Sequence, residues 1–234
     1  LTHCGIKNHC ATRNGIHMNA ETTHPVALIT GGAQRIGAAL AEYLHAAGYN
    51  LVIHYRHSRQ PAEALVKKLN QHRANSAVCF AADLQDIAAL QQLAEQALAQ
   101  WKRLDALINN ASAFSPTPIG SATEQDWDQL IASNMKAPFF LAQALAPTLK
   151  KYAGCIINMA DIYAEKPLAQ HTIYCMAKAG NVMLTKSLAV ELAPAVRVNG
   201  IAPGAILWPS ATDDSHALQQ EKILARIPLQ RTGS

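Results

Sequence analysis

The sequence predicts a single α/β domain in which helices cover both faces of a parallel sheet, and three observations lead to this prediction. Short apolar runs rich in Val, Ile and Leu recur along the chain. Amphipathic segments with helical periodicity separate these runs. No internal repeat, low-complexity linker or domain boundary interrupts the alternation. Such a pattern is typical of a doubly wound sheet, because right-handed crossovers return each helix to one face of the strands.

The expected elements follow one another along the whole chain. A glycine-bearing turn after the first strand leads into the helical segment 38–44. Before the fourth strand, the segment 86–101 places Leu90, Leu93 and Trp101 on one side, as an amphipathic helix does. The apolar runs that we expect to form strands are 25–30, 50–55, 77–81, 104–109, 155–159 and 196–201.

Composition limits the possible functions. The chain has 234 residues, of which 50% are hydrophobic, so one domain with a substantial core is expected. The net charge of +4 arises from 20 basic and 16 acidic residues without a long basic run, so we expect no nucleic-acid partner. No apolar stretch approaches about 18 residues, so we expect no membrane span. Cys79, Cys155 and Cys175 lie in apolar or helical segments, which favours free thiols in the reducing cytoplasm.

The N-terminus differs from the rest of the chain. Residues 1–17 have no periodicity, and a natural start at Met18 fits the sequence better. We expect residues 1–24 to be a disordered or artefactual extension and residues 25–234 to form the domain. We expect no metal site, because the spacing of the potential ligands in the extension matches no zinc pattern. These ligands are His3, Cys4, His9, Cys10 and His17.

A glycine-bearing turn, residues 30–37, connects the first strand to a helix. It reads Thr-Gly-Gly-Ala-Gln-Arg-Ile-Gly, with Arg35 where a middle glycine is usual. Glycine permits close backbone approach and a helix end presents unpaired N–H groups, so the turn predicts a pyrophosphate site. We therefore expect Gly31, Arg35, Ile36 and Gly37 to contact a dinucleotide. An ordinary tight turn is the alternative.

The tip of the second strand indicates which dinucleotide binds. An NAD site usually has an acid there, which holds the ribose 2′-hydroxyl. Residues 54–59 contain none. Arg56, helped by Ser58 or Arg59, could instead bind a 2′-phosphate through charge-assisted hydrogen bonds. We therefore expect NADPH, with Tyr55 and His57 also in its site; a solvated basic loop is the alternative.

Tyr174 and Lys178 lie four residues apart in an expected helix, and Asp161 lies thirteen residues before Tyr174. A helix places positions four apart on one face, so the ammonium can lie beside the phenol. This charge would lower the pKa of Tyr174 from its ordinary value of about 10 and so prepare the phenol for proton exchange. The alternatives are a chance pair on a surface helix and, for Asp161, a helix or turn cap.

The order and spacing of these motifs resemble the short-chain dehydrogenase/reductase superfamily over about residues 25–234. The resemblance implies a Rossmann-like fold, a nicotinamide ribose held by Lys178, and a water chain positioned by Asn134 that feeds Lys178. Asn134 could otherwise be a polar residue on a helix kink made by Pro138. Additional residues that the resemblance places at the cofactor are Asp83, Leu84, Asn110, Ala111, Ser112, Pro203 and Gly204.

A narrower resemblance is to the pteridine reductases. It rests on Arg35, on residues 109–118 and 172–178, and on Asp161, where most of the superfamily has serine. It implies that Phe114 stacks on a pterin, that Arg35 faces both pyrophosphate and pterin, and that Asp161 and Tyr174 touch the substrate. The family continues beyond residues 231–234 into another helix and a seventh strand, so we expect this last helix and strand to be lacking.

The expected function is NADPH-dependent reduction of pterins, from the dihydropterin or dihydrobiopterin to the tetrahydro form, with folates as further substrates. The expected catalytic residues are Asp161, Tyr174, Lys178 and Asn134. A homo-tetramer is expected if the C-terminus permits it. One alternative is the reduction of a 3-oxoacyl thioester or a ketone, for which a hydroxyl rather than Asp161 is usual. Another is a non-catalytic NADP-binding module.

Overall fold

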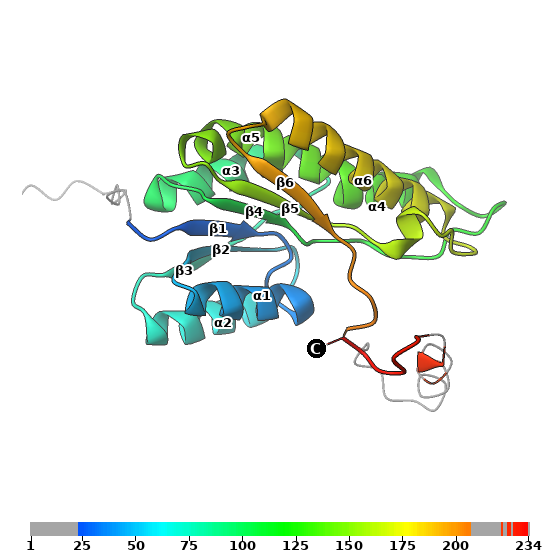
Figure 1. The fold of residues 1–234 in the computed structure, drawn as a ribbon, viewed down its shortest axis with the longest axis horizontal. Helices are drawn as coiled ribbons and strands as arrows, with labels where there is room; N and C mark the ends of the chain where they lie inside the picture. Colours follow the sequence, from blue (N-terminus) through cyan, green and yellow to red (C-terminus); the bar gives the residue numbers. More distant parts are fainter. Residues whose placement is uncertain (1–22, 207–220, 222–223, 226, 234) are drawn as a thin grey trace, which may run out of the picture.

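The computed structural model describes residues 23–206, 221, 224–225 and 227–233, and its centre is one parallel sheet (Figure 1). Within these residues, six strands lie in the order β3-β2-β1-β4-β5-β6. They confirm the predicted doubly wound α/β fold, and each lies within a predicted run, shortened by up to two residues where the strand ladder ends. Their bounds are β1 Val26–Ile29, β2 Asn50–Tyr55, β3 Ala77–Ala81, β4 Ala106–Asn109, β5 Cys155–Met159 and β6 Arg197–Ile201.

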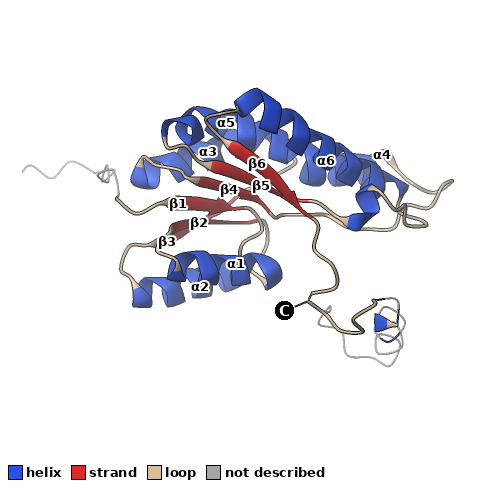
Figure 2. Ribbon diagram, viewed as in Figure 1, coloured by secondary structure: helices blue, strands red, loops and turns tan. Residues whose placement is uncertain are grey.

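Helices cover the sheet in two layers (Figure 2). The first layer is α1 Arg35–Ala46 and α2 Arg59–His72, which pack on Ile29, Leu51 and Ile53. The second layer packs on Leu28, Leu107 and the other faces of the strands. It consists of α3 Ile87–Trp101, α4 Glu124–Ile131, the π-helical turn η1 Ala132–Lys136, α5 Ala137–Lys151 and α6 Thr172–Leu192, and a short 3-10 helix, η2 Ile162–Ala164, precedes α6.

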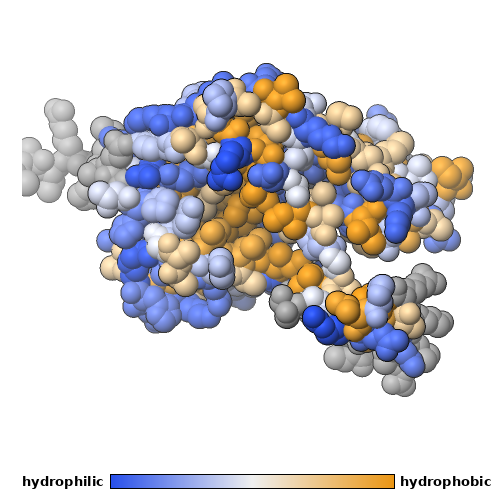
Figure 3. Space-filling view, viewed as in Figure 1, coloured by the Kyte–Doolittle hydropathy of each residue, from blue (hydrophilic) through white to orange (hydrophobic). Residues whose placement is uncertain are grey.

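The first layer leaves part of the sheet uncovered. Among the described residues, α1 and α2 lie over β1, β2 and β3, whereas Cys155 and Ile157 of β5 remain half-buried on this side. On β6, Asn199 and Ile201 are exposed. Hydrophobic surface accordingly gathers between α1 and β6 (Figure 3). β6 pairs with β5 along one edge, and no other described strand pairs with it.

The sheet reverses its strand order at β1, which pairs with β2 on one side and β4 on the other. A crevice forms at such a point beyond the carboxyl ends of the strands, and ligands of doubly wound folds bind there. Every residue that the sequence predicts for the site, among those described, ends a strand, belongs to a segment that follows a strand, or lies in α4–α6. The fold therefore explains how residues from 31 to 204 can serve one site.

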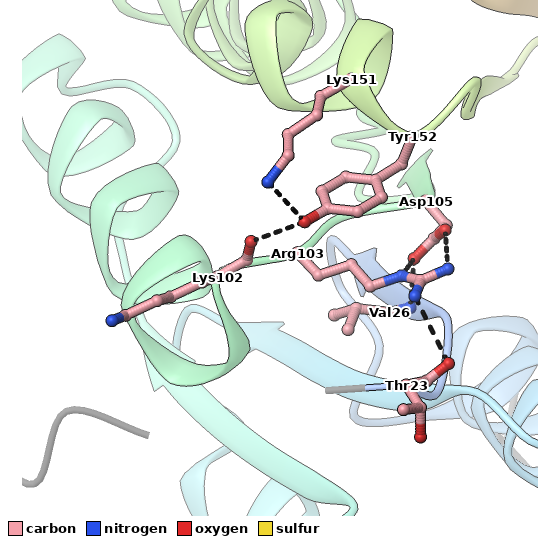
Figure 4. Close-up of polar contacts among 7 residues, drawn as sticks. All are labelled: Thr23, Val26, Lys102, Arg103, Asp105, Lys151 and Tyr152. Carbon is pink, nitrogen blue, oxygen red and sulfur yellow. Dashed lines mark hydrogen bonds and ion pairs between the residues drawn. The ribbon is translucent and has the colours of Figure 1, made fainter. Parts of the chain in front are cut away.

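The opposite end of the sheet is closed by polar contacts (Figure 4). Asp105 forms an ion pair with Arg103 at 2.9 Å and accepts the backbone N–H of Val26 at 2.7 Å. Arg103 also donates to the carbonyl of Thr23, so this residue of the expected extension contacts the domain. The remainder of that extension, up to residue 22, lies outside the described residues. The Arg103 guanidinium lies 4.9 Å from the ring centroid of Tyr152.

Candidate active site

Tyr174 and Asp161 meet at the carboxyl end of β5. The Tyr174 hydroxyl, near the start of α6, donates to Asp161 Oδ2 at 2.6 Å. The other oxygen, Oδ1, accepts the backbone N–H of Tyr163 at 3.0 Å and so caps η2. Asp161 is therefore a helix cap, as the alternative interpretation expects, and its second carboxylate oxygen binds the phenol.

Lys178 lies one helical turn after Tyr174, as the spacing predicts. Its Nζ donates to the carbonyl of Met159 at 2.8 Å and lies 5.7 Å from the ring centroid of Tyr174. The side chain is only 3% exposed. The buried ammonium thus lies near the phenol ring, while the hydroxyl of Tyr174 forms its hydrogen bond with Asp161.

The acid–base properties of the pair differ from the expectation that Lys178 lowers the pKa of Tyr174. Burial, together with the hydrogen bond to Asp161, raises the pKa of Tyr174 well above its ordinary value. Burial lowers the pKa of Lys178 to about 8, and the charge of Asp161 opposes this only in part. The expectation is therefore wrong, because desolvation and the neighbouring carboxylate outweigh the ammonium. Tyr174 keeps its proton at neutral pH and can meet a substrate as a donor.

Asn134 lies in the π-helical turn between α4 and α5. Its Nδ2 donates to the carbonyls of Ala113 and Leu130, and its Oδ1 accepts from Ser112 Oγ at 2.7 Å. Pro138, four residues later, has no N–H to donate to the Asn134 carbonyl. Asn181 of α6 donates to that carbonyl instead, at 2.8 Å.

Phe114 stands over Tyr174 at the surface. Its ring lies edge-on to Tyr174, with centroids 4.8 Å apart, and is 58% exposed. It also stacks on the imidazole of His171, with centroids 4.6 Å apart and planes 16° from parallel. A planar ligand that stacks on Phe114 must therefore use its other face or displace His171.

The glycine turn requires two of its glycines. Gly31 has a φ of +60°, and a Cβ there would lie 3.0 Å from Ala111 Cα. A Cβ on Gly37 would lie 2.4 Å from Gly31 O, closer than any real contact. Arg35 adopts a left-handed φ of +52° at the position where the middle glycine is usual. The cap residue of α1, Gln34, makes no side-chain cap bond, and a helix N-terminus is the kind of position at which proteins bind anions.

The segment after β4 holds this turn in place. Thr30 Oγ1 accepts the backbone N–H groups of Asn110 and Ala111, each at 3.0 Å. Asn110 Nδ2 donates in return to the carbonyls of Thr30 and Gly31, at 2.9 and 3.1 Å. These two expected cofactor residues thus help to build the turn.

Arg56 forms an ion pair with Asp83 at 3.0 Å, and both side chains are nearly half exposed. Two residues that are both expected to contact the dinucleotide thus form an ion pair with each other. Ser58 Oγ donates to Gln34 Oε1 at 3.3 Å, which connects the loop after β2 to the glycine turn. Arg59, by contrast, pairs with Glu63 on the exposed side of α2.

The remaining expected cofactor residues follow the same edge of the sheet. Tyr55 ends β2 and His57 follows it, Ile36 lies in the first turn of α1, and Leu84 is buried after β3. Pro203 and Gly204 follow β6. No group of three or more His, Cys, Asp and Glu side chains suited to a metal ion occurs in the described part of the chain.

Three residues of this region are not found by sequence reasoning. They are His54, which binds the glycine turn, His171, which stacks on Phe114, and Asn181. The sequence does contain an indication for His54, because it is a polar residue in an otherwise apolar strand. Asn181 lies three residues after Lys178 and hence on its face of α6. His171 has no signal, because its position depends on the path of the loop before α6.

A reversal of the strand order at β1, a glycine turn at a helix N-terminus and a Tyr–Lys pair on α6 are together typical of nicotinamide-nucleotide-dependent oxidoreductases. The profile of the family described as "short chain dehydrogenase" matches residues 25–219. The chain belongs to this family, whose members use a nicotinamide cofactor.

Two kinds of curated protein are similar to the chain. Pteridine reductase 1 of Leishmania tarentolae is 36% identical over 256 residues, covering 93% of this chain and 88% of that protein. The 3-oxoacyl-[acyl-carrier-protein] reductase FabG of Staphylococcus aureus is 33% identical over 209 residues, covering 88% and 84%. The 3-oxoacyl-[acyl-carrier-protein] reductase of Synechocystis is 34% identical over 213 residues, covering 90% and 84%. In the described part of the chain, no helix is both long and apolar enough to cross a membrane.

The residues present fit a nicotinamide dinucleotide. A Cβ at Gly31 or Gly37 would press against neighbouring atoms of the protein itself, so the turn needs glycine at both positions, as the glycine turns of dinucleotide sites do. The uncapped N-terminus of α1 supplies N–H donors beside them.

Proposed function

We propose that the protein is an NADPH-dependent reductase of pterins, which converts dihydropterins such as dihydrobiopterin to their tetrahydro forms and also accepts folates. The observation that carries this proposal is the 2.6 Å hydrogen bond between Tyr174 and Asp161 beneath the exposed ring of Phe114. It combines a proton donor, an acid that orients it, and a flat aromatic surface for a bicyclic ring.

The proposed chemistry at Tyr174 is proton transfer. When bound, the cofactor supplies a hydride to the C=N bond of the dihydropterin. The nitrogen must then take up a proton, which the Tyr174 hydroxyl can donate because it keeps its proton at neutral pH. Asp161 holds the hydroxyl in place and relays a proton back to it. Asn134, fixed by Ser112, positions water towards Lys178.

The proposed cofactor is NADPH rather than NADH. Arg56 lies directly after β2, where NAD sites have an acid, and its guanidinium is accessible for a 2′-phosphate although it pairs with Asp83. Lys178 binds the nicotinamide ribose, while Gly31, Gly37 and the N-terminus of α1 hold the pyrophosphate. Asp83 and Leu84 border the adenine, and Pro203 and Gly204 border the nicotinamide.

A second candidate is the reduction of a 3-oxoacyl thioester. The similarity to two 3-oxoacyl reductases, at 33% and 34% identity, favours it. Asp161 argues against it, since a carboxylate paired with Tyr174 would repel the electron-rich oxygen of a ketone, which a hydroxyl would hold by donating a hydrogen bond.

The test is the loss of NADPH absorbance with dihydrobiopterin, dihydrofolate and an acetoacetyl thioester in parallel. We expect turnover with the first two. Turnover of the thioester alone would contradict pterin reduction, and NADPH binding without any turnover would indicate a non-catalytic module. Tyr174→Phe should abolish turnover and retain NADPH binding. Its matched control is Tyr152→Phe, which removes a hydroxyl at the opposite end of the sheet and should leave turnover unchanged.

We further propose that the chain forms homo-tetramers in the cytoplasm. Met176, Met183 and Val190 recur every seven residues on α6 and are 43%, 61% and 82% exposed, and Phe139 of α5 is also exposed. Such a stripe on one helix face suits packing against a second copy. Light scattering should show a smaller assembly for Met183→Glu than for the unaltered protein. An unchanged mass of the variant, or an unaltered protein that is monomeric, would contradict the proposed tetramer.

The thiols Cys79, Cys155 and Cys175 are free, which suits a reducing compartment such as the cytoplasm.

A further inference from the structure

The imidazole of His54 lies between the glycine turn and the end of β3. It is 1% exposed, although it comes from a central, otherwise apolar strand. Its Nδ1 lies 3.1 Å from the backbone N of Gly31, and its Nε2 lies 3.0 Å from the carbonyl oxygen of Ala82. Both ring nitrogens therefore have backbone partners on two different segments.

These partners determine the protonation of the ring. The Gly31 N–H can only donate, so Nδ1 must be without a proton. The Ala82 carbonyl can only accept, so Nε2 must carry the proton. The ring is accordingly the neutral tautomer with hydrogen on Nε2. Burial lowers the pKa of His54 and keeps it in this neutral form.

The backbone of His54 binds the same turn. Its carbonyl accepts the N–H of Gly32 at 3.0 Å, so one residue receives two successive N–H groups of the turn. On the other side, the Gly31 carbonyl accepts from Asn110 Nδ2. Gly31 is thus held from β2 through its N–H and from β4 through its carbonyl, in the left-handed conformation that only glycine adopts readily.

The second nitrogen extends these contacts to β3. Ala82 directly precedes Asp83, which pairs with Arg56, and Arg56 lies two residues after His54. The ring therefore connects three segments of the proposed dinucleotide site: the glycine turn, the tip of β2 and the residues after β3.

We propose that His54 is a positioning residue for the nicotinamide-nucleotide site, which it preorganises by holding Gly31 through an unprotonated Nδ1. The inference rests on the proposed binding of NADPH at the glycine turn. A turn that is already fixed spares the cofactor the entropy of ordering it, so loss of the acceptor weakens binding without touching the cofactor itself.

Two substitutions separate the two ring nitrogens. In His54→Asn, the side-chain oxygen takes the place of Nδ1 and can accept from Gly31. In His54→Gln, the side-chain nitrogen takes the place of Nε2 and can donate to Ala82. We expect His54→Asn to keep the Kd for NADPH within about threefold and His54→Gln to raise it by about tenfold, as for a buried N–H left without an acceptor. The matched control, His72→Asn at the exposed end of α2, should leave the Kd unchanged.

Binding is measured by NADPH fluorescence titration, and thermal unfolding without cofactor shows whether each variant is folded. A second readout is independent of binding: the imidazole ¹⁵N resonances of His54 in the cofactor-free protein should show an unprotonated Nδ1. A Nδ1-protonated ring, or a His54→Gln variant that binds at least as tightly as His54→Asn, would overturn the role of His54 alone. Failure of the unaltered protein to bind NADPH would overturn the proposed function and, with it, this inference.

Discussion

Replacement of Lys178 by Met should make the protein more stable and inactive. The Lys178 ammonium is almost fully buried, and burial lowers its pKa from 10.5 to about 8. A tenfold change in a proton equilibrium corresponds to about 1.4 kcal/mol, so keeping this charge inside the folded protein at pH 7 costs about 3 kcal/mol. Met fills a similar volume without the charge but loses the hydrogen bond to the Met159 carbonyl, worth about 1 kcal/mol. We therefore expect Lys178→Met to raise the free energy of unfolding by about 2 kcal/mol.

The change of stability with pH provides a second check on this prediction. The pKa of Lys178 is lower in the folded than in the unfolded chain, so the unfolded chain binds more protons between about pH 8 and 10.5. The stability of the unaltered protein should therefore rise across this range as the buried ammonium loses its proton. The advantage of Lys178→Met should shrink over the same range.

Urea unfolding at pH 7 and near pH 10 measures both effects, with Lys186→Met on the exposed side of α6 as the control. The control should change stability little at either pH, and only Lys178→Met should abolish reductase activity. If Lys178→Met were less stable than the unaltered protein at pH 7, or if its advantage did not fall at high pH, the assignment of a costly buried charge would be wrong.

The other predictions concern the turn, the acid and the buried imidazole. Gly37→Ala should weaken NADPH binding by more than about tenfold with unchanged circular dichroism, because its Cβ would meet Gly31 O; titration at parental affinity would contradict this. Asp161→Asn should lower the rate with dihydrobiopterin at least about tenfold and leave NADPH affinity unchanged, and an unaltered rate would remove Asp161 from proton transfer. Acid should destabilise the protein as the pH falls below about 6.5, because the pKa of His54 is lower in the folded than in the unfolded chain. In His54→Asn this loss in urea unfolding should be smaller, and an equal loss would assign it to other groups.

Most of the strands are predictable from sequence because they are short apolar runs bounded by polar or turn residues, whereas β6, with Arg197 and Asn199, carries a weaker apolar pattern. The Tyr174/Lys178 spacing is predictable for a similar reason, since a helix fixes it locally. The pairing of Arg56 with Asp83 is not, because it depends on β2 lying beside β3, which no local pattern encodes.

The electrostatic state of the site was the least predictable part. From spacing alone, an ammonium near a phenol lowers the pKa of the phenol. In the structure the burial of Tyr174 and the orientation of Asp161 reverse this effect, and both depend on packing between η2, α6 and the loop of Phe114. The stacking of His171 on Phe114 depends on the same loop path.

The position of the glycine turn at the junction of β1 and β4 has a consequence for how the protein is made. The amide of Asn110 that fixes the turn lies 80 residues after Thr30, with β2 and β3 in between. A nascent chain that has not yet reached Asn110 therefore contains every glycine of the turn and the contacts from His54, but not the hydrogen bonds that hold the turn from the β4 side. In such an intermediate the turn is held from one side only, and the apolar edge of β1 stays open until β4 is synthesised and pairs with it. The binding site is thus acquired late, when the two halves of the sheet join.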